Sequence, residues 1–203
     1  MNILGFNCFG HDSAATLVID DKVVFAVEEE RLNRKKHDGS LPVNAIKECL
    51  KFVNISLSDL DHITFSWNPQ ISYSKMPLFL FKYFWRVPNL LRESKNFTIE
   101  ENLGMLHYLK DMKHLSETLN KHFPSSKEPK FKLHLLEHHF CHAASAFFCS
   151  PFEEAAIMTI DGAGEWTTAQ LSYGKGNKIE IKGGGCSTGI FRGDERRREN
   201  LAR

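Results

Sequence analysis

The sequence predicts an α/β fold, because apolar runs with the length of strands alternate with segments of helical period. Residues 15–19 and 22–27 are two such runs, and the acidic two-residue turn between them indicates a β-hairpin. Residues 42–53 repeat apolar positions at helical spacing. Residues 155–160, AAIMTI, form a continuous apolar run of the kind expected for a strand buried on both faces.

The first third of the chain predicts strands on either side of one helix. Residues 3–6 form a short apolar strand, and the polar loop 7–13 leads from it into the hairpin. Pro42 stands where the first turn of a helix tolerates proline, and this helix crosses back to the sheet. Residues 62–67, HITFSW, alternate enough in character to form the next strand.

Residues from about 68 to 129 predict a helical insertion. The pattern changes there to long helical periods, and Thr98 and Glu101 have the spacing of a capping box. Residues 77–87 are the richest apolar run, but two basic residues interrupt it and it has about half the length of a membrane span. A buried helix or a hydrophobic flap is therefore favoured over a membrane anchor.

A predicted strand at 131–135 leads into residues 137–148, EHHFCHAASAFF, which carry three histidines and a cysteine close together. If this stretch is a helix, His138 and His142 stand at i and i+4, so both imidazoles project from one face, as two metal ligands from one helix require. The alternative is that they are ordinary polar residues where a strand meets a helix, because the HxxxH spacing alone is weak evidence.

The apolar run 155–160 ends in the turn that contains Asp161, Gly162 and Gly164. Glycine lets a backbone approach a ligand closely, and the N–H groups of such a turn can bind phosphate oxygens. The aspartate can hold a metal or its water. The alternative is a plain glycine turn before a second hairpin, formed by residues 167–182.

The loop after the first strand carries His11 and Asp12 at a strand end. A histidine there could take the proton of a hydroxyl while the aspartate orients its ring, or it could be an exposed loop residue. The charged run 28–36, EEERLNRKK, is either a solvated segment or a binding loop for an anion.

The composition is that of a soluble globular protein, with 203 residues of which 42% are hydrophobic. The net charge of +1, with both signs mixed along the chain, gives no reason to expect nucleic acid or an anionic membrane as a partner. Five cysteines without a CxxC pair favour a reducing cytoplasm, and the N-terminus lacks the pattern of a secretory signal.

The last residues, 183–203, contain five glycines, an arginine cluster and no hydrophobic period. They cannot bury enough apolar area to offset the entropy lost on ordering, so they are predicted to be a disordered tail. A basic tail that binds nucleic acid is the less favoured alternative.

Three blocks of sequence, in this order, resemble the N-terminal part of the nodulation and antibiotic O-carbamoyltransferases. They are FNCFGHDSAATLVIDDKVVFAVEEERLNRKKH at residues 6–37, EHHFCHAASAFFCSPF at 137–152 and AAIMTIDGAGEW at 155–166. The resemblance covers residues 1–182 and is weakest across the helical insertion. It implies the first lobe, with a mixed sheet, of an actin-like ATPase (ribonuclease H-like) fold, in the branch shared with tRNA threonylcarbamoyl-transfer proteins.

The resemblance also implies a reaction. ATP and carbamoyl phosphate would give a carbamoyl-adenylate, whose carbamoyl group passes to a hydroxylated small molecule or sugar. The metal expected is Fe²⁺, with Zn²⁺ or Mg²⁺ as alternatives, acting as a Lewis acid. The implied residues are His138 and His142 for the metal, His11 and Asp12 for proton transfer, Asp161, Gly162 and Gly164 for phosphate, and Arg31 and Lys36 for anionic groups.

The chain also departs from the family pattern, which continues for several hundred residues and supplies a further aspartate ligand. The sequence after Lys182 no longer resembles the family, as in a truncated or frame-shifted gene product. A fragment with a weak, open metal site that is inactive alone is therefore expected. The alternative is a non-catalytic metal- or nucleotide-binding module, and the oligomeric state is left open.

Overall fold

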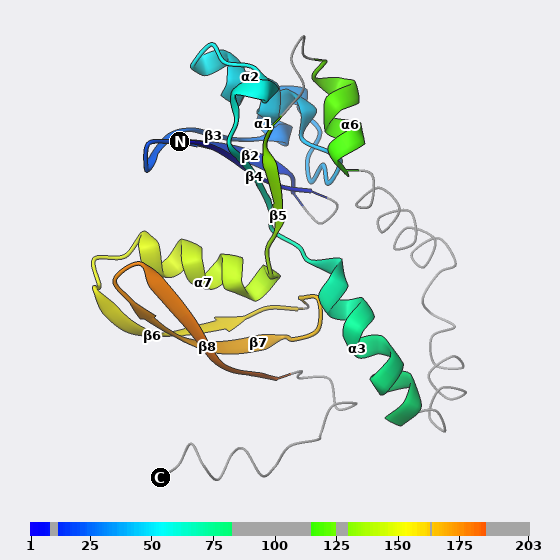
Figure 1. Cartoon of the computed structure of the whole chain (residues 1–203), viewed down its shortest axis with the longest axis vertical. Helices are drawn as coiled ribbons and strands as arrows, with labels where there is room; N and C mark the ends of the chain where they lie inside the picture. The colour runs from blue at the N-terminus through cyan, green and yellow to red at the C-terminus, as the bar shows by residue number, and fades with distance from the viewer. Residues whose placement is uncertain (9–11, 83–114, 125–129, 163, 186–203) are drawn as a thin grey trace. The chain divides into compact units, whose positions relative to one another are not determined.

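The computed structural model describes residues 1–8, 12–82, 115–124, 130–162 and 164–185. The chain divides into two compact units, Met1–Leu136 and Glu137–Arg203, each of which has its own sheet. Figure 1 labels the helices and strands of both. The division falls inside residues 1–182, for which the sequence predicts one lobe, because the strands after residue 137 pair with one another.

The first unit contains a five-stranded mixed sheet, which confirms the predicted α/β class. Its strands are β1 (Asn2–Asn7), β2 (Ala14–Ile19), β3 (Lys22–Glu28), β4 (His62–Phe65) and β5 (Lys132–Leu135), in the order β3-β2-β1-β4-β5. The pairs β1–β2 and β2–β3 are antiparallel, whereas β1–β4 and β4–β5 are parallel. A mixed sheet of this kind is what an actin-like first lobe is expected to contain.

The predicted hairpin between β2 and β3 is confirmed. Its two turn residues, Asp20 and Asp21, both have positive φ, at 46° and 64°. A two-residue hairpin turn of type I′ requires positive φ at both positions, and aspartate tolerates this conformation better than most residues. The side chain of Asp20 also accepts a hydrogen bond from the N-terminal ammonium of Met1 at 2.5 Å.

The helical segments of the first unit are α1 (Glu29–Asn33), α2 (Val43–Phe52), the 3-10 helix η1 (Leu57–Asp59), α3 (Pro69–Lys82) and α6 (Leu115–His122). Of these, α2, η1 and α6 contribute residues to the apolar core that packs against the sheet. The predicted helix after Pro42 is therefore confirmed as α2, which buries Ile46 and Cys49 fully. On the sheet side of the same core, Leu4 and Leu17 have no exposed surface.

The N-terminus of α2 is satisfied by a buried carboxylate from α1. Glu29, which is 2% exposed, accepts hydrogen bonds from the backbone N–H groups of Asn44 at 3.3 Å and Ala45 at 2.7 Å. The first N–H groups of a helix have no partner within it, so an acceptor there stabilises the helix. This contact explains why a glutamate of the charged run is inside the unit.

The predicted helical insertion is only partly within the described residues. The helices α3 and α6 lie in it, whereas Thr98, Glu101 and the rest of residues 83–114 lie outside the described residues. Pro77 stands inside α3. Of the helices that can be described, none combines the length and the apolar character that a membrane crossing needs.

The second unit is a helix packed on a three-stranded antiparallel sheet. It consists of α7 (His138–Phe148), β6 (Glu154–Ile160), β7 (Ala169–Lys175) and β8 (Lys178–Gly185), with the sheet order β6-β7-β8. Ala143 and Phe147 of α7 meet Ile157 of β6 in a small core. The second predicted hairpin is confirmed, with Gly176 at φ +55° in its turn.

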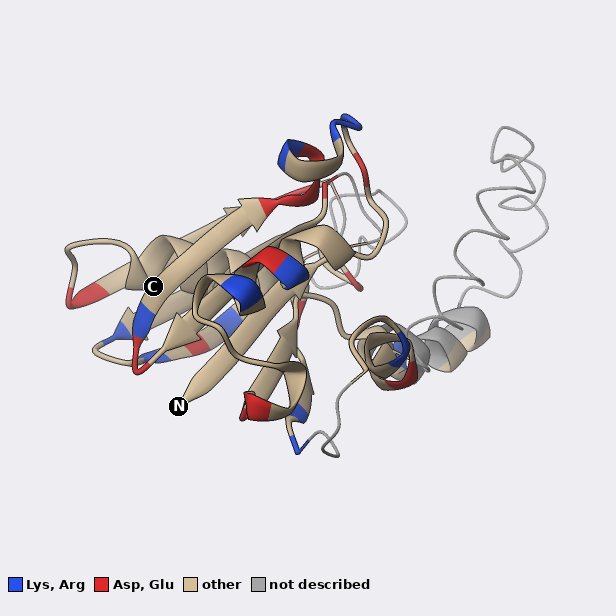
Figure 2. Cartoon of the chain, turned by 90° about the horizontal axis from the view of Figure 1, so that it is seen from above, with Lys and Arg blue, Asp and Glu red and all other residues tan. Residues whose placement is uncertain are grey.

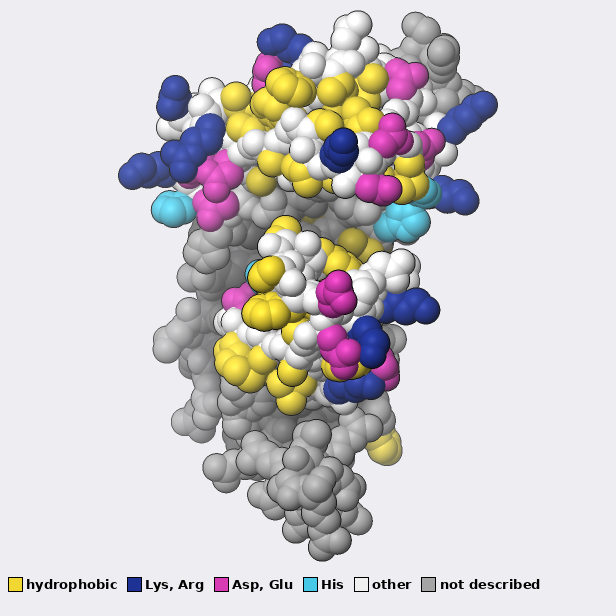
Figure 3. Space-filling model, turned by 90° about the vertical axis from the view of Figure 1, so that its left-hand side faces the viewer, with side chains coloured by type: hydrophobic (Ala, Val, Ile, Leu, Met, Phe, Trp, Pro, Cys, Tyr) yellow, Lys and Arg dark blue, Asp and Glu magenta, His cyan; other side chains and the backbone are white. Residues whose placement is uncertain are grey.

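Two expectations for this unit are wrong. β6 is not buried on both faces, because Ile157 and Thr159 are buried towards α7 while Met158 and Ile160 are 66% and 72% exposed. Exposed hydrophobic side chains are visible as yellow areas in Figure 3. The tail does not begin at residue 183, since Gly183, Gly184 and Gly185 pair with β7 through backbone groups that need no side chain. Residues 186–203 lie outside the described residues.

Acidic and basic residues are interspersed along the described elements, as Figure 2 shows. Many form local pairs on the surface, such as Glu48 with Lys51 and Glu154 with Lys175. This arrangement agrees with the mixed charge of the sequence.

Candidate functional site

The predicted histidine pair lies on one face of α7. The stretch is helical, and the Nε2 atoms of His138 and His142 are 3.0 Å apart. The side chains are 22% and 49% exposed, so solvent reaches both rings. The i, i+4 spacing therefore does bring the two nitrogen atoms together.

Asp161 completes a three-residue cluster with this pair. It directly follows β6, and its Oδ2 atom lies 2.7 Å from Nε2 of His138 and 3.2 Å from Nε2 of His142. Two ligands at right angles on an ion, each about 2.1 Å from it, are about 3.0 Å apart. The three measured separations of 3.0, 2.7 and 3.2 Å therefore fit three ligands on one face of an octahedral ion.

Asp161 is ionised at neutral pH. A hydrogen bond from His138, followed by the backbone N–H of Gly162 at 2.6 Å and by His142, lowers the pKa of Asp161 from 3.8 to about 2. An ionised carboxylate is the form that binds a metal. The sequence assigned Asp161 to phosphate, or to a metal or its water, and the structure places it at both histidines.

A buried histidine, His139, holds α7 against β6 behind the cluster. It has no exposed surface, its Nδ1 lies 2.9 Å from Oγ1 of Thr159 and its Nε2 lies 2.8 Å from the carbonyl oxygen of Thr167. Because a carbonyl only accepts, Nε2 carries the proton and Nδ1 accepts from the threonine hydroxyl. No role for His139 was predicted, although a residue that directly follows a site residue projects about 100° around the helix from it.

Glu165 binds the first backbone N–H of α7. Its two carboxylate oxygens lie 3.0 and 3.1 Å from the backbone N of His138, and the residue is 7% exposed. An anion at the N-terminus of a helix also interacts favourably with the helix dipole. The turn after β6 therefore supplies the cap of the helix that carries the histidines, a role that the sequence analysis did not identify.

Two backbone N–H groups of the glycine turn already donate hydrogen bonds within the protein. Gly162 N–H donates to the Oδ1 atom of Asp161, and Gly164 N–H donates to the carbonyl of Thr167 at 2.9 Å. Residue 163, between them, lies outside the described residues. Phosphate binding by this turn stays a prediction, and it would have to compete with these two hydrogen bonds.

Cys141 is close in sequence to the histidines but stays a neutral thiol. Burial, together with the negative charges of Glu165 and Glu137, raises the pKa of Cys141 to about 11. A thiol must lose its proton to bind a metal tightly.

The site residues predicted in the first unit are more widely spread than those of the His138 cluster. His11 lies outside the described residues, and Lys36 is exposed. Asp12 lies 3.1 Å, through Oδ1, from Nδ1 of His37. The predicted contact of Asp12 with His11 therefore lies outside the described residues. The imidazole beside Asp12 is that of His37, which was not predicted as a site residue.

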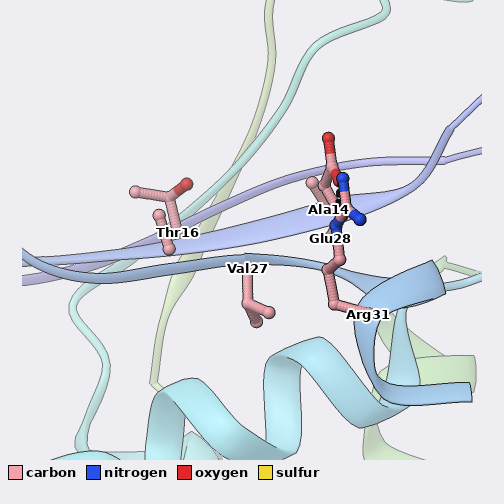
Figure 4. Close-up of a pocket in the computed structure, with 6 residues that line it drawn as sticks. Ala14, Thr16, Val27, Glu28 and Arg31 are labelled. Carbon is pink, nitrogen blue, oxygen red and sulfur yellow. Dashed lines mark hydrogen bonds and ion pairs between the residues drawn. The ribbon is translucent and has the colours of Figure 1, made fainter.

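Arg31 lines a shallow open pocket of about 360 Å³ at the ends of β2 and β3 (Figure 4). Its guanidinium is 3.1 Å from a carboxylate oxygen of Glu28 and 3.6 Å from one of Glu30. The pocket walls are Ala14, Thr16, Ala26, Val27, Glu28 and Arg31. An anion that binds Arg31, as predicted, would have to compete with two carboxylates.

A comparison with protein families places the chain in one of them. The family model described as Carbamoyltransferase N-terminus matches residues 2–184. The uncharacterized protein sll1178 of Synechocystis is 40% identical over 182 residues, covering 88% of this chain and 28% of the relative. Nodulation protein NolNO of Sinorhizobium fredii is 33% identical over 174 residues, covering 86% of this chain and 23% of the relative.

The chain thus spans less than a third of the length of these two relatives. Among solved structures, YeaZ from Pseudomonas aeruginosa aligns with a TM-score of 0.44 and 10% identity, over 90% of this chain and 66% of that one. A similarity this low adds no argument about fold or function.

Proposed function

We propose, since the chain belongs to the carbamoyltransferase N-terminus family, that it holds the divalent metal used in an O-carbamoyl transfer. The observation that carries this proposal is the convergence of His138, His142 and Asp161, whose donor atoms lie 2.7 to 3.2 Å apart. The solvent exposure of these side chains leaves other positions on the ion open to a substrate, as a catalytic site requires.

The donor set favours ferrous iron. Two imidazoles and one carboxylate on one face, with open positions, form the arrangement typical of non-haem Fe²⁺ sites. Mg²⁺ prefers oxygen ligands and is disfavoured by the two nitrogens, whereas Zn²⁺ accepts this set too. When bound, the ion would act as a Lewis acid on phosphate oxygens.

The three cluster residues would hold and orient the metal ion rather than react themselves. His138 and His142 offer nitrogen lone pairs, and the ionised Asp161 supplies a negative charge that matches a cation. Behind them His139 and Glu165 fix the start of α7 against the turn that carries Asp161. Such outer contacts restrict ligand orientation and typically change metal affinity by about 10- to 100-fold.

The substrates proposed are carbamoyl phosphate, ATP and a hydroxylated acceptor, with a carbamoyl-adenylate as the donor of the carbamoyl group. Family membership supports the carbamoyl transfer, and ATP use is our extension of it. His11 is proposed to take the acceptor proton, with Gly162 and Gly164 near phosphate. Because the chain spans 28% and 23% of the two relatives described above, this whole reaction is proposed for a protein of their length.

Anaerobic calorimetric titration with Fe²⁺ tests the metal site. We expect the variant His138→Ala/His142→Ala to lose one equivalent of bound Fe²⁺ relative to the unchanged chain, because both nitrogen ligands are removed. The exposed His122, replaced by alanine, is the matched control and should leave the stoichiometry unchanged. An equal stoichiometry in the double variant and the unchanged chain would refute the proposal.

A second titration separates the transferase role from that of a metal-binding module without catalysis. If the site serves a nucleotide-dependent reaction, ATP should bind the Fe²⁺-loaded chain more tightly than the metal-free chain, and the double variant should show no such difference. Fe²⁺ binding with no effect on ATP binding would favour the non-catalytic module.

A further inference from the structure

We infer that Asp12, Glu30 and His37 form a second divalent-cation site, in the first unit. Each offers one ligand atom, and these atoms all lie within 4.8 Å of one another. The three residues come from different segments: the loop before β2, helix α1 and the segment that follows α1. This site shares no residue with the His138 cluster and does not depend on the proposed function.

The distances suit ligands of one ion. Nδ1 of His37 lies 3.1 Å from Oδ1 of Asp12, close to the separation of about 3.0 Å that adjacent ligands of an octahedral ion have. Glu30 is positioned beside them, because its Oε2 atom accepts a hydrogen bond of 3.2 Å from the backbone N–H of His37. An ion would therefore find three donors within a small rearrangement of the side chains.

The backbone that carries Asp12 and His37 is fixed by contacts outside the cluster. Ser13, which is 1% exposed, donates from its N–H and its hydroxyl to the carbonyl of Asp38, at 2.9 and 2.8 Å. The side chain of Asp38 in turn accepts from Asn33 at 2.6 Å and from the backbone N–H of Ser40 at 3.1 Å. Each of the two ligands is thus adjacent in sequence to a buried anchor, which lowers the entropy lost on binding an ion.

The charges of this region leave room for a cation. Arg31 lies nearer to Glu28, at 3.1 Å, than to Glu30, at 3.6 Å. Lys35 is paired with Asp38 at 3.4 Å. The two carboxylates of Asp12 and Glu30 carry two negative charges, which a divalent ion balances at short range.

The donor set indicates which ions bind. One imidazole nitrogen with two carboxylate oxygens suits a borderline ion such as Zn²⁺ or Mn²⁺ better than Ca²⁺, which takes oxygen ligands. The side chains of Asp12 and His37 are 48% and 73% exposed, so water would occupy the remaining positions. The site is therefore open, and an oxygen of a hydroxylated or anionic ligand could replace that water.

Zinc titration of the full chain carrying His138→Ala/His142→Ala tests the inference, because the first cluster is then removed. We expect one equivalent of Zn²⁺ to bind by calorimetry. Adding His37→Ala or Asp12→Asn to this background should weaken that binding at least about tenfold. Adding His122→Ala, an exposed histidine in α6, should leave it unchanged, and circular dichroism should show that all variants are folded.

Two results would overturn the second site: no Zn²⁺ binding by the His138→Ala/His142→Ala chain, or binding that survives His37→Ala at full strength. Either result leaves the first cluster intact as a proposal, because that cluster is measured by the difference between the unchanged chain and the double variant. If the unchanged chain and the His138→Ala/His142→Ala chain bound equal amounts of metal while the His37-dependent binding remained, only the proposed function would be refuted.

Discussion

Gly164 lies so close to His139 that a Cβ atom added to it would be 2.8 Å from Cδ2 of the imidazole and 3.2 Å from its Nε2. No ordinary contact is this short, so the glycine is required by the buried histidine rather than by backbone conformation. This close approach is therefore one of the contacts that hold the glycine turn against the helix of the metal cluster.

Gly164→Ala should push His139 away from the carbonyl of Thr167 and disturb the start of α7. We expect the free energy of unfolding to fall by about 1–3 kcal/mol, as for other insertions into packed interiors, and Fe²⁺ affinity to fall with it. Urea denaturation and calorimetry measure the two effects. Gly162→Ala is the matched control, because nothing lies within 4 Å of a Cβ at that position. Equal effects of both changes would contradict this account.

Thr159→Val should weaken metal binding without removing a ligand. The change keeps the shape of the side chain but leaves Nδ1 of the buried His139 without its donor, which typically costs about 1–3 kcal/mol. We expect Fe²⁺ affinity to fall roughly tenfold, as for other outer contacts of metal ligands. In the control Thr167→Val, the carbonyl that accepts from His139 remains, so affinity should stay near that of the unchanged chain.

Acid should destabilise the metal-free chain partly through Asp161. The pKa of this carboxyl is lowered from 3.8 to about 2 in the folded chain, chiefly by the hydrogen bond from His138. A carboxyl with a lowered pKa stabilises the fold above its unfolded pKa, and that contribution is lost as the pH falls through the folded pKa. Unfolding free energies measured between neutral pH and pH about 2 should therefore fall less steeply in Asp161→Asn than in the unchanged chain. Asp21→Asn, in the exposed hairpin turn, should keep the steeper fall.

Glu29→Ala should destabilise the first unit, because it removes the carboxylate that caps α2 from a buried position. The expected loss is about 1–2 kcal/mol of unfolding free energy, the upper part of the range for helix caps. Glu48→Ala, on the same helix, removes a surface pair with Lys51 at 3.2 Å and should cost less than about 1 kcal/mol. Urea denaturation followed by circular dichroism compares them. A smaller effect at Glu29 than at Glu48 would rule out the capping role.

Sequence patterns predicted those parts of the fold that depend on local chemistry. The hairpin at Asp20 and Asp21, helix α2 and the shared face of His138 and His142 all follow from residues within one or two turns of one another. The contacts of Glu165 with the backbone of His138, and of Asp12 with His37, join residues 27 and 25 positions apart. Spacing in sequence carries no information about such pairs, so only the three-dimensional arrangement reveals them.

The prediction that β6 is buried on both faces was wrong for a related reason. Its apolar run is real, but Ile157 and Thr159 are its buried residues, as are their partners Ser172 and Gln170 on β7, while Met158 and Ile160 face outwards. The run of hydrophobic letters could not indicate which side of the strand α7 covers.

The neutral thiol of Cys141 has a consequence for oxidation chemistry. With a pKa of about 11, only about one molecule in ten thousand carries the reactive thiolate at pH 7. Peroxides attack the thiolate, so this cysteine should resist conversion to sulfenic acid even though it lies beside two proposed ligands of a redox-active ion.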